Sequence, residues 1–179
     1  MLDAQLQTII QSTLIAGLAA RGISGVSAKQ NNQPRQFAAP SSPTIFFTYG
    51  GRKKWGWPSY ADTLNEDGVT FTRTVAQVVH TRFQIAGFTP ASPSTPEQYT
   101  SGDLSSIAAD ILTFEDAISA YVAQGCNVLR VQDLPGVWFQ DSSGQNVLWS
   151  SFDIIFTHKD VFVSSTPTIG NFAGSVNRI

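Results

Sequence analysis

The amino-acid sequence predicts an α+β fold, a mostly antiparallel β-sheet packed by two amphipathic helices. Apolar residues recur at helical spacing in two segments, 3–21 and 103–124. The segments between and after them are rich in β-branched and aromatic residues, and in part they alternate apolar with polar side chains. The order is therefore helix, strands, helix, strands. Because strand and helix do not alternate regularly, we expect antiparallel rather than parallel pairing.

Length and composition suit one domain with a terminal arm. The chain has 179 residues, 42% of them hydrophobic, a net charge of −2 and one cysteine. A chain of this length can bury a core without staples, and one cysteine excludes a disulfide within the chain. We expect Cys126 to be a buried thiol. We expect residues 1–163 to form a single α+β domain and residues 164–179, which lack any period, to form a C-terminal arm.

The first half of the chain begins with the helix over 3–21. Asp3 suits its first turn, and Gly22 suits the position just after its end. Residues 22–43 form a proline-punctuated connector in which 23–26 is a candidate edge strand. The β-branched and aromatic run TIFFTYGG, residues 44–51, predicts a strand.

The second half is dominated by a long alternating segment, residues 69–88. Twenty residues is long for an ordinary strand, so the segment is either two strands or one strand that extends beyond the sheet as a β-arm. A loop over 89–103 precedes the second helix, 103–124. Further strand signals flank the turn DSSGQN at 141–146.

Residues suited to catalysis or metal binding are few. His80 and His158 are the two histidines, and neither lies in a recognisable catalytic motif, so we expect exposed strand positions and no enzymatic activity. His158 and Asp160 share a strand face, but the sequence offers no further metal ligand. The acids around NEDG lack calcium-loop spacing. We therefore expect no cofactor and no metal site.

Targeting signals are also absent from the sequence. No apolar run approaches the length of a membrane span. The N-terminus carries Asp3 and no early Lys or Arg, unlike a secretion signal, so an intracellular product without membrane contact is expected.

The segment RKKWGWP, residues 52–58, concentrates charge in a chain with only 13% charged residues. We interpret 50–68 as a loop or hairpin tip. Three roles remain open for it: contact with a partner, since Trp and Arg are enriched at interface hot spots; local packing of the tryptophans; or nucleic-acid binding through cations and indoles. The candidate contact residues, including two in the C-terminal arm, are Arg52, Lys53, Lys54, Trp55, Trp57, Phe172 and Ile179.

The order of these segments resembles a known group of phage proteins. An N-terminal helix is followed by QFAAPSSP at 36–43, the strand TIFFTY, a GW-containing loop, and RTVAQVVHTRFQIAGF at 73–88. A helix and a further strand complete the pattern, which covers roughly residues 1–163. In this order the chain resembles the neck or tail-terminator proteins of tailed bacteriophages, in particular the gateway proteins of contractile-tailed phages.

The resemblance implies a non-enzymatic ring component with a tail-terminator-like fold. It implies a homohexameric ring in the virion neck that caps the head-proximal end of the tail tube and sheath and joins the collar or connector protein. DNA passes through the lumen of such a ring without sequence recognition, and the protein is made in the host cytoplasm. We hypothesise that 50–68 and 165–179 are assembly elements, with strands added between subunits.

Two other classes of function stay open. One is a different head–tail connector component, such as a collar, adaptor or tail-completion protein. The other is a small hydrolase or binding domain, which a tight pocket around His80 or His158 would indicate.

Overall fold

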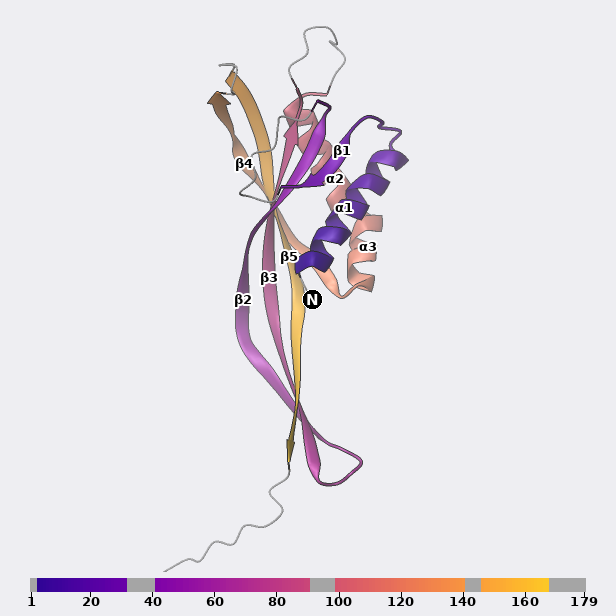
Figure 1. Ribbon diagram of the computed structural model, residues 1–179, viewed down its shortest axis with the longest axis vertical. Coiled ribbons are helices and arrows are strands. Elements are labelled where there is room, and N and C mark those ends of the chain that lie inside the picture. The colour runs from indigo at the N-terminus through magenta and orange to yellow at the C-terminus, as the bar shows by residue number, and fades with distance from the viewer. Residues whose placement is uncertain (1–2, 32–40, 91–98, 141–145, 168–179) are drawn as a thin grey trace, which may run out of the picture.

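A five-stranded mixed sheet with three helices on one face makes up the computed structural model, which describes residues 3–31, 41–90, 99–140 and 146–167. The expected α+β class is confirmed (Figure 1). The elements are α1 (Asp3–Ala20), β1 (Ser27–Gln30), β2 (Thr44–Leu64), β3 (Thr70–Phe88), α2 (Ser101–Thr113), α3 (Glu115–Ala123), β4 (Cys126–Gln140) and β5 (Asn146–Pro167).

The sheet order is β1-β2-β3-β5-β4. Every pair is antiparallel except β1 with β2, which is parallel. The edge strand β1 begins at Ser27, so the expectation of a strand over 23–26 is wrong by a few residues. Its Ala28 is the buried position and faces the helices, beside Ile45 of β2.

The core lies between the three helices and the upper part of the sheet (Figure 1). Helix α1 buries residues at three- and four-residue spacing, as the sequence predicts for its amphipathic face. Cys126 is buried, as expected. The side chains that are fully buried and largest include Leu6, Ile10, Leu14, Ile45, Phe47, Phe83, Ile85, Leu104, Leu112, Tyr121, Phe152 and Phe156.

The second predicted helix, 103–124, is two helices. Phe114 has an extended backbone, with φ −67° and ψ 152°, and it separates α2 from α3. Glu115 and Asp116 then occupy the first turn of α3, where acidic side chains favour a helix start. The apolar period is almost continuous through this break, so periodicity alone does not reveal it.

Strands β2, β3 and β5 are the dominant feature, with 21, 19 and 22 residues. They run beyond the helices as a three-stranded extension (Figure 1), here named the β-ribbon: residues 55–64, 70–78 and 159–167, with the turn at 65–69. At about 3.3 Å per residue the ribbon is about 30 Å long. The alternative of a single long strand forming a β-arm is thus correct for 69–88.

The same feature corrects two expectations. Residues 50–68 are mostly strand rather than loop, because β2 continues to Leu64. Two β-bulges, between Tyr49 and Gly51 and between Trp55 and Ser59, absorb residues that would otherwise break the strand. At the other end β5 continues to Pro167, so 164–167 pair with β3. Residues 168–179 of the C-terminal arm lie outside the described residues.

Candidate functional site

The segment Arg52–Trp57 lies within β2 and not at a hairpin tip. Lys53 pairs with His80, Lys54 with Val79 and Trp55 with Val78. The tip itself is the turn at Asn65–Val69. The expectation of a basic, tryptophan-rich tip is therefore wrong in position, because strand pairing extends past the bulges.

Being on a strand divides the segment between the two faces of the sheet. Arg52 pairs with Thr81, which is buried on the helix-covered face. Lys53 and Trp55 pair with His80 and Val78, on the opposite face. Arg52 and Lys53 are adjacent in the sequence but therefore lie on opposite faces of the sheet.

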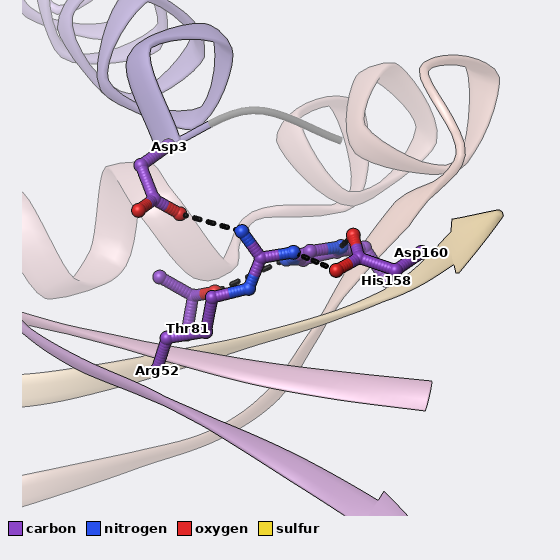
Figure 2. A network of polar contacts seen from close by, with 5 residues as sticks. All are labelled: Asp3, Arg52, Thr81, His158 and Asp160. Carbon is purple, nitrogen blue, oxygen red and sulfur yellow. Dashed lines mark hydrogen bonds and ion pairs between the residues drawn. The ribbon is translucent and has the colours of Figure 1, made fainter. Parts of the chain in front are cut away.

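On the helix-covered face, Arg52 is the centre of a polar network where the ribbon leaves the body (Figure 2). Its Nη1 lies 3.5 Å from Oδ1 of Asp3 in α1, and its Nη2 donates to Oδ2 of Asp160 in β5. His158 Nε2 lies 3.1 Å from the Thr81 hydroxyl, and its Nδ1 lies 3.7 Å from Asp160. The network joins the start of α1 to the three long strands.

Burial and neighbouring charges together shift the pKa values of His158 and Asp160 in this network. His158 is 3% exposed, so the expectation of an exposed strand position is wrong for this residue. Burial lowers its pKa. Burial raises the pKa of the Asp160 carboxyl, but opposing charges that include Arg52 outweigh this and leave the pKa below its usual value. The Thr81 side chain has no solvent contact, so this hydroxyl–imidazole–carboxylate series ties strands together and presents no accessible nucleophile.

This burial predicts a pH-dependent stability. The unfolded pKa of His158 is about 6.5, and the folded value is lower, so the unfolded chain binds more protons between them. Stability should be full above about pH 6.5 and fall as the pH drops from there. The lowered carboxyl pKa values act only below about pH 4. We expect a lower Tm at pH 5.5 than at pH 7.5, measured by circular dichroism.

Two variants test whether His158 causes this dependence of Tm on pH. His158→Gln should flatten the dependence of Tm on pH between 5.5 and 7.5, whatever its Tm at neutral pH. His80→Gln, at a partly exposed site, should retain the wild-type dependence. Equal slopes for wild type and His158→Gln would contradict the assignment.

The acidic residues near the tip serve the hairpin. Asp62 accepts two hydrogen bonds from Arg73, at 2.8 Å each. Asp67 accepts from the backbone N–H groups of Val69 and Thr70 at 2.9 and 3.0 Å. Within the described residues no group of three His, Cys, Asp or Glu side chains could hold a metal ion.

Trp55 and Trp57 lie near the middle of β2 and are both exposed. The Trp55 ring stacks on His80 at 5.3 Å between centroids, and Lys53 Nζ lies 5.3 Å from the Trp55 ring centre. Trp57 is 96% exposed and follows Gly56, whose φ of 69° belongs to the second bulge. The Trp57 side chain therefore does not pack on any described part of its own domain. Phe172 and Ile179 lie outside the described residues.

Sequence reasoning missed a row of exposed apolar side chains on the ribbon. Tyr60, Val75 and Phe162 are direct cross-strand neighbours. Tyr60 and Phe162 are 65% and 67% exposed. Leu64 and Phe71 form a second such pair nearer the tip. The consecutive apolar run at 161–163 was the available signal, because it places apolar side chains on both faces of one strand.

The ribbon also has two open edges. Among the described residues, β1 pairs with β2 only at 44–47, and β4 pairs with β5 only from Asn146 to His158. The outer edges of β2 beyond Phe47 and of β5 beyond His158 have no described strand partner. Long open edges beside apolar side chains are a template for pairing with another chain.

Comparison with known proteins gives the family. A family model described as E217 gateway protein gp29 matches residues 5–168. The chain belongs to this gateway protein family. A search of curated proteins gave no match.

As a gateway protein, the chain is a structural component of the phage virion with a role at the head–tail connector. Such a role implies contact with other head and tail proteins. In the part of the chain that the structure describes, no helix is long and apolar enough to cross a membrane.

Proposed function

We propose that this gateway protein forms a homohexameric ring that caps the head-proximal end of the tail tube and sheath. The ring joins the tail to the collar or connector protein, and DNA passes through its lumen. The observation that carries the proposal is the β-ribbon, whose apolar rows and edges are left uncovered by the described parts of a single copy. The family match supports the location of the ring in the neck.

The geometry of the ribbon favours a ring over a two-fold dimer. Its open edges belong to different strands, β2 on one side and β5 on the other. Pairing the β2 edge of one copy with the β5 edge of the next is a heterologous contact, which closes into a ring if the rotation per subunit allows. The rows led by Tyr60 and Phe162 would then continue from subunit to subunit and lose their exposure to water.

The proposed contact residues take different parts in such an assembly. Lys53, Lys54, Trp55 and Trp57 have exposed side chains along the ribbon root and stay candidates for subunit or partner contacts. Arg52 is engaged with α1 and β5, so we assign it to positioning the ribbon. Phe172 and Ile179, with the rest of the chain beyond β5 at 168–179, remain proposed contacts.

Negative-stain electron microscopy of the purified protein, with and without tail tubes, tests the proposal. We expect six-fold rings, or a cap at one end of each tube. Monomers that never bind tubes would contradict it and would favour a collar, adaptor or tail-completion role.

A matched pair of variants connects assembly to the ribbon. The double variant Tyr60→Ser with Phe162→Ser should leave the free energy of unfolding within about 1 kcal/mol of wild type, because both side chains are already exposed. The same double variant should abolish rings and caps. The control is Phe114→Ser with Val122→Ser, at positions 60% and 57% exposed on the helical layer, which should assemble normally. Equal loss in both pairs would argue against the ribbon as the interface.

A further inference from the structure

The sheet face opposite the helices has a charge distribution of its own. Buried Val79, Thr81 and Phe83 of β3 point toward the helical side, so His80 and Arg82 point away from it. By strand register, five cations share this open face: Lys29, Lys53, Arg82, Arg130 and Lys159. Among the described residues the acid on this face is Asp153, which is 8% exposed and lies 3.5 Å from Arg82.

The other acids gather elsewhere. Those of the helical layer are Asp3, Asp103, Asp110, Glu115 and Asp116, and those of the hairpin tip are Glu66 and Asp67. By strand register, Asp62, Asp133 and Asp160 belong to the helix-covered face of the sheet. A protein with a net charge of −2 therefore has one face that is locally positive.

Four of the cations form a compact group, the open-face patch: Lys53, Arg82, Arg130 and Lys159. Arg82 and Arg130 flank Ile155 in one cross-strand row, Lys53 belongs to the next row, and Lys159 to the one after. Rows on one face are about 7 Å apart and strands about 4.8 Å apart, so the patch covers about 14 Å in each direction.

The side chains around the patch favour a polyanion over a protein surface. Gln84, Asn127, Gln132 and Thr157 surround the arginine rows on this face, and these residue types, with Lys and Arg, make most phosphate contacts. A protein interface would place a desolvated apolar centre there. Beside the patch, Ile155 is half-buried between its two arginines and Trp55 is stacked on His80, with Val78 next to them, whereas Val161 and Val163 lie further along the ribbon.

We propose that the open-face patch contacts the phosphate backbone of double-stranded DNA without reading its sequence. Duplex DNA carries one charge per about 1.7 Å of axis, so several phosphates pass over a patch of this length. The Trp55–His80 stack lies between Lys53 and Lys159 and supplies a flat surface beside the cations. This inference rests on the proposed function for its setting, since it assigns the open face to the channel of the ring.

Binding of a labelled 30-base-pair duplex to the full-length protein, followed by fluorescence anisotropy from 25 to 200 mM salt, tests the proposal. Wild type should bind two duplexes of unrelated sequence equally, with a log–log salt slope of about −3 to −4 per protomer, since about four phosphates are contacted. The triple variant Lys53→Gln, Arg130→Gln and Lys159→Gln should bind at least about tenfold more weakly. Its negative salt slope should be shallower by about 3, because three phosphate contacts are lost.

The control removes equal charge elsewhere. The triple Arg21→Gln, Lys29→Gln and Arg73→Gln changes exposed cations outside the patch and should bind within about threefold of wild type at each salt concentration. Equal weakening by both triples would mean a response to net charge alone and would overturn the assignment. So would wild type failing to bind duplex at the lowest salt.

Imaging the same proteins with tail tubes separates this proposal from the ring proposal. Capping by wild type without DNA binding would overturn the patch assignment and leave the proposed function standing. DNA binding that depends on the patch, in a protein that forms no rings, would support the patch and contradict the ring. Loss of capping by the patch triple with unchanged DNA binding would identify an acidic protein partner and overturn the DNA proposal.

Discussion

Replacing Gly87 with alanine should destabilise the protein by about 3 kcal/mol or more. Gly87 lies near the end of β3, where the first turn of α2 crosses the sheet. An added Cβ would lie 2.4 Å from the Ser101 carbonyl oxygen and 2.8 Å from the Leu104 Cβ. Because the nearest atom is helix backbone, relief requires α2 to move away from β3.

That movement would also break a set of serine hydrogen bonds. Ser101 Oγ donates to the Gly87 carbonyl at 2.6 Å, and the Gly87 N–H donates to Ser105 Oγ at 3.0 Å. Ser105 Oγ in turn donates to the Ser150 carbonyl at 2.7 Å, and the Ser150 N–H donates to Ser101 Oγ at 3.0 Å. Two helix serines thus join β3 to β5, and moving α2 leaves their buried partners unsatisfied.

Thermal unfolding followed by circular dichroism measures the effect. For a chain of this size we expect Tm to fall by about 6–12 °C. Gly102→Ala, in the same turn of α2, is the control, because its Cβ would meet only the Thr100 hydroxyl at 3.7 Å. That variant should be neutral or slightly stabilising, since alanine favours a helix over glycine. Equal Tm values for the two variants would contradict the close packing at Gly87.

Phe156→Ala should cost about 3–5 kcal/mol, the range for deleting a buried aromatic ring. Phe156 of β5 has no solvent contact. Its ring meets Phe83 edge-on at 6.1 Å and Tyr121 at 5.2 Å between centroids. The deletion therefore removes apolar burial and two aromatic contacts where the sheet meets α3.

Phe162→Ala is the matched change on the same strand. Phe162 lies on the same face of the sheet six residues further along, and it is 67% exposed. We expect its loss to change stability by less than about 1 kcal/mol in urea unfolding and to weaken ring formation. A similar loss of stability in both variants would mean that the ribbon is part of the folding core.

Periodicity predicted much of the fold and missed the length of β2. The alternation through 69–88 identified β3, and the apolar face of 3–21 identified α1. Residues 51–58 contain Gly51, Gly56 and Pro58, which normally interrupt strands. In the structure β2 retains its pairing through two bulges, and Pro58 lies in the second, on an edge without a described partner. Bulges depend on the neighbouring strand, so composition did not reveal them.

The sequence identified residues of the candidate site but not their contacts or the sheet face on which each lies. The sequence singled out the segment that starts at Arg52. It could not show that Arg52 meets Asp3 and Asp160, which lie 49 and 108 positions away. It also assigned no faces to Lys53 and Trp55, because a bulge shifts the alternation of every residue that follows it. The open-face patch has the same origin, since its cations come from four strands.

The sheet order also determines when, during synthesis of the chain, the β-ribbon can form. Strand β3 needs β5 as its second neighbour, yet α2, α3 and β4 are synthesised between them. Pairing over such a separation is slow, because the intervening chain must be closed into a loop first. A nascent chain therefore offers a β2–β3 hairpin but no finished ribbon until β5 has been synthesised. We expect that a nascent chain cannot join a growing assembly through its ribbon before β5 has left the ribosome.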